Sequence, residues 1–202
     1  MVKVKICGVT NVEDARVAAA AGAWAIGLNF FPRSVRCVSQ ETAEAIVAAL
    51  PREVWRVGVF VDAPAESVRE TAERLHLDAL QFHGDESAEY CRGWRQRVIK
   101  AVRLRDRDAL ARVAAYAVDF ILVDAYVEGL VGGTGRTVRW DWLSGVERDR
   151  LILAGGLTPE NVAAAVRVVR PMAVDVASGV ERSPGEKDPE RVRRFILNAQ
   201  SA

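Results

Sequence analysis

Short apolar runs alternate with longer amphipathic segments along the whole chain. The clearest repeat lies between Leu151 and Gly179, where LILAGGL is followed by TPENVAAAVRVVRP and then by MAVDVASG. An apolar run, a segment with helical periodicity and a second apolar run indicate a strand, a helix and a strand. We expect Thr158 to be the N-cap of the helix and Pro159 to occupy its first position. Pro171 then ends the helix.

The same strand and helix unit recurs at intervals of roughly 20 to 30 residues, as expected of repeated βα units. Eight strands are predicted, at residues 2–6, 24–30, 55–61, 79–82, 98–102, 120–124, 151–154 and 173–176. The gaps between them carry apolar stripes at helical spacing, and we expect helices to fill all of them. This pattern predicts a (β/α)8 TIM barrel forming a single compact domain over residues 1–202. An open doubly wound sheet is the alternative, but no GxGxxG motif follows the first strand.

Composition narrows the class of partner and the compartment. Half of the residues are hydrophobic and the net charge is +1, with both signs spread along the chain, which argues against nucleic-acid binding. The longest apolar run, Val17 to Leu28, is too short to span a bilayer, and the first residues lack the apolar block of a signal peptide. Cys7, Cys37 and Cys91 are too widely spaced for a disulfide framework or a zinc knuckle. We therefore expect a cytoplasmic protein with a small-molecule partner, no membrane contact and no metal.

Polar or reactive residues follow several of the predicted strands, where the active sites of such barrels lie. Cys7 follows the first strand, Arg36 the second and His83 the fourth, while Asp124 ends the sixth. The role of His83 stays open, because a lone histidine can orient a neighbour, bind substrate or satisfy the backbone. The loop from Tyr126 to Thr137 contains four glycines, and we expect it to close over a substrate.

Two small-residue turns follow the last two strands. Gly155 and Gly156 come after the seventh strand, and Ser178 and Gly179 come after the eighth. Exposed backbone N–H groups at such turns can surround an anion. One glycine turn is more often only a tight turn, but two matching turns one strand apart favour a phosphate site.

The first strand carries a charged residue and a thiol on one face. Alternation places Val4 and Ile6 toward the helices, so Lys5 and Cys7 should face the barrel interior. An ammonium near a thiol favours its thiolate. Lys5 needs an anionic partner there, and Asp175 at the end of the neighbouring eighth strand is the candidate. For the other two cysteines we expect the usual buried, inert state.

Several motifs in a fixed order carry a resemblance to a known family. They are KICGVTNVEDA, GLNFFPRSVRCVS, VGVFVD, LQFHGDE, GGTGRTVRWDW, LAGGLTPENV and VDVASGVERSPGEKD. With these motifs the chain resembles, from end to end, N-(5'-phosphoribosyl)anthranilate isomerase, a (β/α)8-barrel family of tryptophan biosynthesis. The sequence departs little from the family pattern, mainly in loops, and the role of Glu128 after the sixth strand is open.

The resemblance implies an Amadori rearrangement that converts N-(5-phosphoribosyl)anthranilate, without a cofactor, into 1-(2-carboxyphenylamino)-1-deoxyribulose 5-phosphate. By motif, Cys7 is implied to be the general base and Asp124 the general acid. Arg36 is implied to hold the anthranilate carboxylate, and Asp175 to contact a sugar hydroxyl in addition to, or in place of, Lys5. The residues implied to hold the phosphate are Gly155, Gly156, Ser178 and Gly179.

Two other functions are compatible with the two phosphate-binding turns. Another phosphosugar isomerase or epimerase would use different groups at the strand ends, often paired carboxylates or metal ligands, and Cys7 with Asp124 argues against it. A barrel that only binds a phosphorylated ligand would have no need of Cys7. A homodimer is compatible with a small barrel of this kind, with Phe31, Trp94 or Trp142 as candidate surface aromatics.

Overall fold

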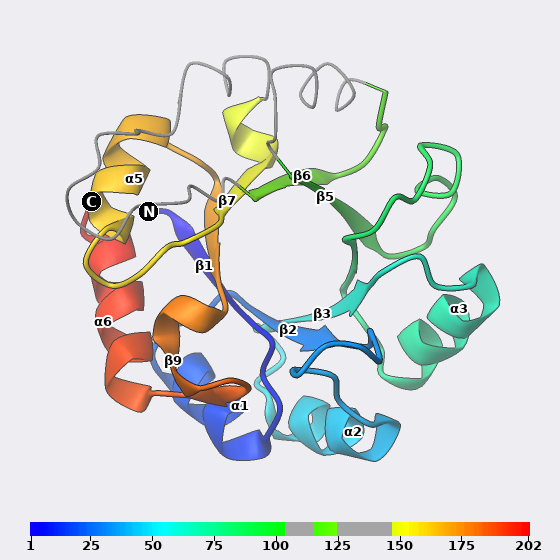
Figure 1. Cartoon of the computed structure of the whole chain (residues 1–202), viewed down its shortest axis with the longest axis horizontal. Helices are drawn as coiled ribbons and strands as arrows, with labels where there is room; N and C mark the ends of the chain where they lie inside the picture. Colours follow the sequence, from blue (N-terminus) through cyan, green and yellow to red (C-terminus); the bar gives the residue numbers. More distant parts are fainter. Residues whose placement is uncertain (104–114, 125–146) are drawn as a thin grey trace.

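A computed structural model describes residues 1–103, 115–124 and 147–202 of the chain. Its eight main strands are parallel and form a closed barrel in chain order, with β8 paired to β1 (Figure 1). They are β1 Lys3–Cys7, β2 Ala25–Asn29, β3 Trp55–Phe60, β4 Ala79–Phe82, β5 Arg97–Arg103, β6 Phe120–Asp124, β7 Leu151–Ala154 and β8 Ala173–Val176. The predicted barrel is therefore confirmed, and the open sheet is wrong.

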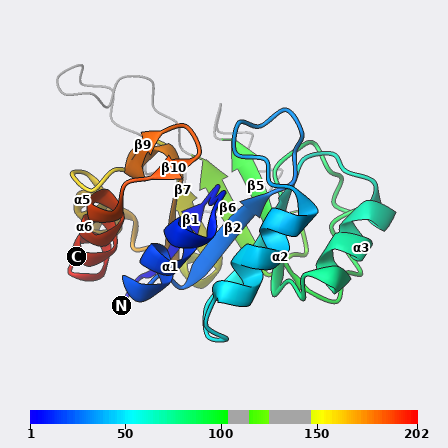
Figure 2. The same cartoon turned by 90° about the horizontal axis from the view of Figure 1, so that it is seen from below.

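Helices surround the barrel on its outside (Figures 1 and 2). Those within the described residues are α1 Val12–Ala20, α2 Gln40–Ala49, α3 Ala65–Arg74, α5 Val162–Val169 and α6 Pro189–Gln200, with short 3-10 turns η2 Arg148–Arg150 and η3 Ser178–Val180. Three of them have an N-cap residue whose side chain accepts a hydrogen bond from a backbone N–H of the first turn. These residues are Asn11, Ser39 and Asp188. These caps satisfy backbone donors that a helix leaves unpaired and so fix where each helix begins.

A small hairpin follows β8 and lies at the end of the barrel to which the strands point (Figure 2). Its strands are β9 Glu181–Ser183 and β10 Glu186–Lys187, which pair antiparallel. The Thr10 hydroxyl donates a hydrogen bond of 2.6 Å to the carbonyl of Gly185 in the hairpin turn. The hairpin is thus attached to the loop that follows β1.

The start of α5 differs from the prediction. The helix begins at Val162, and a separate turn precedes it, because the Thr158 carbonyl accepts from the N–H groups of Asn161 and Val162. The Asn161 side chain in turn accepts from the N–H of Thr158 at 2.8 Å. Thr158 and Pro159 therefore lie in this turn and are not the N-cap and first residue. The predicted end is confirmed, since the helix stops at Val169 before Pro171.

The gap between β4 and β5 contains turns and no helix, contrary to the prediction that helices fill every gap. A buried ion pair lies there, with Lys100 Nζ 2.7 Å from Glu86 Oε2. Tyr90 and Trp94 cover Phe82, with ring centroids 5.2 and 5.4 Å from that of Phe82. These turns cover the outer face of the sheet where a helix would otherwise lie.

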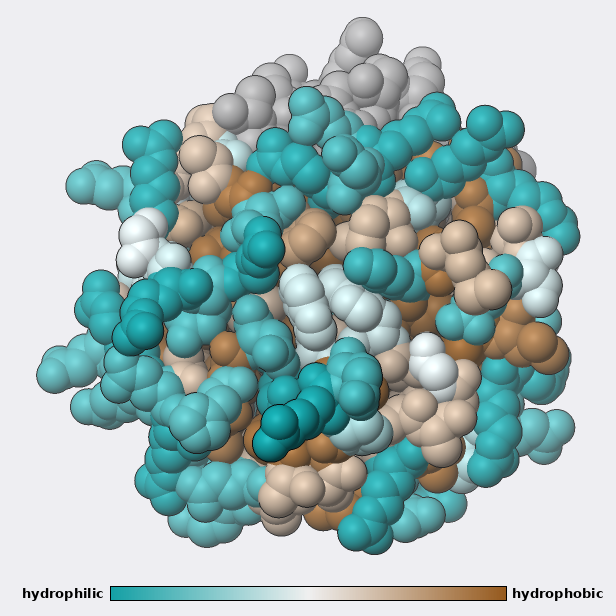
Figure 3. Space-filling model, turned by 180° about the vertical axis from the view of Figure 1, so that it is seen from behind, coloured by the Kyte–Doolittle hydropathy of each residue, from teal (hydrophilic) through white to brown (hydrophobic). Residues whose placement is uncertain are grey.

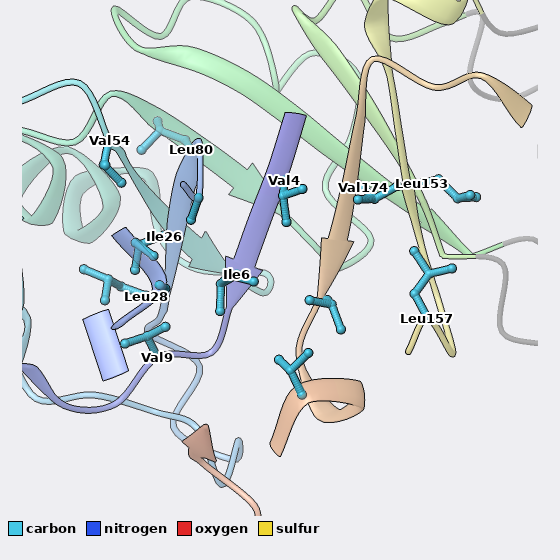
Figure 4. Packing of buried hydrophobic residues seen from close by; sticks show 14 of the residues in the cluster. Val4, Ile6, Val9, Ile26, Leu28, Val54, Leu80, Leu153, Leu157 and Val174 are labelled. Atoms are coloured by element: carbon cyan, nitrogen blue, oxygen red, sulfur yellow. The ribbon is translucent and has the colours of Figure 1, made fainter. Parts of the chain in front are cut away.

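Two hydrophobic layers stabilise the barrel. The outer layer joins the strands to the helices, and Figure 4 shows part of it, with Val4, Ile6, Ile26 and Val174 projecting from β1, β2 and β8. The predicted apolar stripes of α5 and α6 are buried in this layer. The inner layer fills the barrel with mostly small residues, which are Ala25, Val57, Ala79, Ile99, Ala101, Leu122, Ile152, Ala154 and Ala173.

The opposite end of the barrel is closed by aromatic rings. Trp24 and Trp55 lie with their centroids 4.7 Å apart, and Phe120 packs edge-on against both. Lys3 Nζ lies 5.0 Å from the centre of the Trp24 ring. Figure 3, which views the molecule from this side, shows hydrophilic side chains over much of the surface around a paler centre. These rings therefore block entry to the barrel interior from this end.

The exposure of the cysteines and of the candidate surface aromatics differs in part from the expectation. Cys37 is exposed, so the expectation of a buried thiol is wrong there, while Cys91 is buried as expected. Phe31 and Trp94 are both partly buried, and Trp142 lies outside the described residues. Among the described helices, none is long and apolar enough to cross a membrane.

Candidate functional site

A cavity of about 280 Å³ lies at the carboxyl ends of the strands, on the side of the hairpin. Strands on all sides of the barrel contribute to it, because successive parallel strands end at the same rim. The cavity is lined by all of the residues that the sequence analysis selected, namely Cys7, Arg36, Asp124, Gly155, Gly156, Asp175, Ser178 and Gly179. The structure thus brings together residues that are up to 172 positions apart.

Cys7 lies beside a buried ion pair. Lys5 Nζ is 2.8 Å from Asp175 Oδ1, and the Lys5 side chain is fully buried. The pairing follows from strand register, since Lys5 and Asp175 are directly opposite across β1 and β8. A Cβ on Gly27 would lie 2.8 Å from Cys7 Sγ and 3.0 Å from Lys5 Nζ. Glycine at this position therefore leaves the space in which thiol and ammonium lie close together.

Burial raises the pKa of the Cys7 thiol and outweighs the opposing effect of the Lys5 ammonium, which lowers it. Asp175 raises the pKa of Cys7 further, because its negative charge opposes that of a thiolate. Lys5 acts in the expected direction, but the effect of burial is larger, so the pKa of the Cys7 thiol lies above its ordinary value.

Asp124 faces His83 across the cavity, with 4.0 Å between Asp124 Oδ2 and His83 Nε2. Burial lowers the pKa of His83, and this outweighs the raising effect of Asp124, so the imidazole is neutral near pH 7. Gln81 Nε2 lies 3.1 Å from His83 Nδ1. With the amide as donor, the imidazole proton lies on Nε2 and faces the carboxylate. His83, whose role was open, thus lies beside Asp124 in the cavity, at a distance beyond that of a direct hydrogen bond.

Arg36 enters the cavity from the loop after β2. Its guanidinium makes two hydrogen bonds to Glu181, from Nε to Oε1 at 2.7 Å and from Nη2 to Oε2 at 2.6 Å. A side chain at Gly8 would contact the stem of Arg36, and Gly8 has a φ of +66° that favours glycine. The Arg36 fork is therefore held in one orientation at the rim of the cavity.

The two glycine turns form the wall of the cavity at the ends of β7 and β8. Gly155 and Gly156 have φ of +93° and +62°, so both occupy conformations that favour glycine. In the described part of the chain, no carbonyl accepts from the N–H groups of Gly155 or Gly156. A Cβ on Gly179 would contact the carbonyl oxygen of Leu157, so the two turns touch each other. Together they present donors to an anion from adjacent strands.

Sequence reasoning missed several residues of this site. Glu181 lies in the motif VDVASGVERSPGEKD, but its partner is 145 positions away and no local pattern shows the pairing. Gln81 lines the cavity, and its Oε1 is buried without a hydrogen-bond partner among the described residues. Gln81 Oε1 is therefore an acceptor without a partner beside the cavity. The predicted closing loop, Tyr126 to Thr137, and Glu128 within it lie outside the described residues.

The described side chains include no group of three or more His, Cys, Asp or Glu that could hold a metal ion. The chemistry available in the cavity is that of a thiol, a carboxyl group beside a neutral imidazole, a fixed guanidinium and an anion-binding wall.

Comparisons with known proteins show which family the chain is similar to. A family model described as N-(5'phosphoribosyl)anthranilate (PRA) isomerase matches residues 4–198. The N-(5'-phosphoribosyl)anthranilate isomerase of Pelobacter propionicus is 47% identical over 201 residues, covering 99% of this chain and 96% of the relative. The crystal structure of phosphoribosyl anthranilate isomerase from Thermotoga maritima is 45% identical, with full coverage of both chains and a TM-score of 0.91.

A second solved structure was determined with a ligand. It is phosphoribosyl anthranilate isomerase in complex with reduced 1-(o-carboxyphenylamino)-1-deoxyribulose 5-phosphate, 43% identical with full coverage of both chains and a TM-score of 0.89. This ligand combines a phosphate, a sugar chain and an aromatic carboxylate.

Proposed function

Because the chain belongs to the N-(5'-phosphoribosyl)anthranilate isomerase family and is a phosphoribosylanthranilate isomerase of tryptophan biosynthesis, we propose that Cys7 and Asp124 catalyse its rearrangement. The substrate is N-(5-phosphoribosyl)anthranilate and the product is 1-(2-carboxyphenylamino)-1-deoxyribulose 5-phosphate. The observation that carries the proposal is that a thiol and a carboxyl group from β1 and β6 line one cavity with two anion-binding turns.

The reaction needs one acid and one base. Asp124 protonates the furanose ring oxygen, the bond from that oxygen to C1' breaks, and the nitrogen lone pair forms a Schiff base. Cys7, as the thiolate, removes the proton from C2', and the electrons of that C–H bond give the enolamine. The enolamine takes a proton at C1' and loses one from the C2' hydroxyl to become the ketone. Neutral His83, 4.0 Å from Asp124, supports a carboxyl group that must hold and release a proton.

The remaining cavity residues bind the substrate in this proposal. The N–H groups of the two glycine turns hold the phosphate, and the edge of the Arg36 guanidinium that Glu181 does not occupy holds the anthranilate carboxylate. Asp175, already paired to Lys5, accepts a hydrogen bond from a sugar hydroxyl. In these assignments the ribose lies between Cys7 and Asp124.

The test is loss of anthranilate fluorescence from the substrate, followed without added metal or cofactor. Cys7→Ser and Asp124→Asn are each expected to lower kcat by about 10²- to 10⁴-fold with little change in substrate affinity. Cys37→Ser is the matched control, because this exposed cysteine does not line the cavity. Turnover near the wild-type rate in either cavity variant would remove that residue from catalysis.

We also propose three properties of the whole molecule, namely a single domain, a homodimer and a cytoplasmic location. Strands from both ends of the sequence pair in one closed sheet, which supports a single domain over residues 1–202.

Another Thermotoga maritima structure, 41% identical with a TM-score of 0.87 and full coverage, is described as monomers generated from a dimeric enzyme. This supports a homodimer, which sedimentation equilibrium of the purified chain would test. A cytoplasmic location follows from the biosynthetic role and is tested by cell fractionation.

A further inference from the structure

The guanidinium of Arg36 is held by a carboxylate from the far end of the chain. Glu181 occupies its Nε and one N–H of Nη2, at 2.7 and 2.6 Å. Guanidinium has five N–H donors, so three remain, and they lie along the Nη1 and Nη2 edge. No described residue accepts a hydrogen bond from Nη1. One edge of the Arg36 guanidinium is thus bound within the protein, and the other edge can bind a ligand in the cavity.

Glu181 is itself held in place from a second direction. Lys187 Nζ lies 2.8 Å from Glu181 Oε1 and 3.2 Å from the carbonyl of Ala177. The Lys187 side chain is fully buried, and that of Glu181 is 5% exposed. The backbone N–H of Lys187 also donates to Asp14 Oδ2 at 2.9 Å, which ties β10 to α1. Glu181 therefore has little freedom to move with Arg36.

Charge balance points to an anionic ligand at this position. Arg36 and Lys187 are cations and Glu181 is an anion, so the three connected side chains carry one excess positive charge. A single carboxylate on the free edge of Arg36 would balance it. In such an arrangement one carboxylate of the protein orients the guanidinium, and the opposite edge of the guanidinium binds the carboxylate of a ligand.

We propose that Glu181, with Lys187 as its counter-charge, is a positioning residue that fixes Arg36 so that the enzyme selects ligands with a carboxylate on the aromatic amine. This rests on the assignment of Arg36 to the anthranilate carboxylate above. Glu181 does not touch the substrate in this account. It acts by removing the other orientations of a long, flexible side chain before the ligand binds.

The experiment measures binding by titration calorimetry with two ligands. One is reduced 1-(o-carboxyphenylamino)-1-deoxyribulose 5-phosphate, and the other is the same compound made from aniline, which lacks the carboxyl group. Arg36→Met, Glu181→Gln and the double variant are compared with the wild type. Glu186→Gln is the matched control, since Glu186 is an exposed, ion-paired carboxylate on the same hairpin that contacts Arg182 and not Arg36.

Glu181→Gln is expected to weaken binding of the carboxylated ligand about tenfold, because the fork loses its fixed orientation. Binding of the aniline compound should stay within about twofold, and Glu186→Gln should affect neither ligand. Arg36→Met is expected to weaken the carboxylated ligand by roughly 10- to 100-fold, and adding Glu181→Gln to it should cause little further loss. This non-additivity is the signature of a residue that acts through Arg36.

Equal weakening of both ligands by Glu181→Gln, or independent effects in the double variant, would overturn the proposal. If Glu181→Gln lowers the melting temperature strongly, Glu181→Asp gives the same test. It keeps the charge next to Lys187 but is one methylene too short to hold both nitrogens of Arg36. Wild-type turnover is measured in parallel. A wild type that prefers the carboxylated ligand but does not isomerise the substrate would refute the proposed function and leave the role of Glu181 supported.

Discussion

Replacing Gly179 by alanine tests whether the two glycine turns act as one phosphate site. A Cβ at this position would contact the carbonyl oxygen of Leu157 and lie 3.0 Å from its carbonyl carbon and 3.2 Å from Val176 Cγ2. Two of these atoms belong to the backbone, which cannot rotate away as a side chain can. The turn after β8 must therefore move away from the turn after β7. Overpacking of this kind costs about 1–3 kcal/mol of stability.

The effect on binding follows from the same displacement. Each charge-assisted hydrogen bond from a turn N–H to the phosphate is worth about 1.5–3 kcal/mol. Loss of one such bond raises the dissociation constant by roughly 10- to 100-fold. The dissociation constant for inorganic phosphate and the KM for phosphoribosylanthranilate should therefore both rise by that factor in Gly179→Ala, while kcat changes less.

Gly22→Ala is the control for backbone strain alone. Gly22 has a φ of +96°, and its new Cβ would meet other atoms only at 3.9 Å or more, after α1 and away from the cavity. Its left-handed conformation costs about 1–2 kcal/mol with alanine, which lowers the melting temperature without changing phosphate affinity. The reasoning is refuted if Gly179→Ala folds and binds phosphate and substrate as the wild type does.

Three further results are expected. In the Asp124→Asn variant, whose amide does not titrate, the residual kcat/KM should rise with pH between about 6 and 9, because the Cys7 thiol, whose pKa burial raises, must lose its proton to act as the base; a flat profile in that variant would contradict that role. Lys5→Met should destabilise the fold by about 3–5 kcal/mol in urea unfolding, since Asp175 is left buried without its counter-charge, and adding Asp175→Asn should restore part of the loss. If the double variant shows simple additivity, the two side chains are not coupled. Glu86→Gln should lower the free energy of unfolding by about the same amount, because it leaves the buried Lys100 without its counter-charge under the turns between β4 and β5. Unchanged stability would show that this ion pair does not stabilise those turns.

Local sequence patterns were sufficient to predict the barrel and the types of residue at the carboxyl ends of its strands. Alternation along β1 predicted that Lys5 and Cys7 face inward, and strand closure then identified Asp175 as the partner of Lys5, found at 2.8 Å. The apolar stripe of α5 and its end before Pro171 were read from periodicity and from the conformational limits of proline. These features depend on neighbours a few positions apart, or on the order of strands in a closed sheet, so sequence alone can predict them.

The tertiary structure decided what depends on distant contacts and on burial. Glu181 is paired with Arg36 across 145 positions, and no spacing rule connects two such residues before the hairpin is placed over β1. The missing helix between β4 and β5 reflects packing of Tyr90 and Trp94 over a buried ion pair, which overrides a regular repeat. The direction in which the Cys7 pKa shifts depends on how far water is excluded, because desolvation raises that pKa while the Lys5 ammonium lowers it, and the balance is set by the folded surroundings.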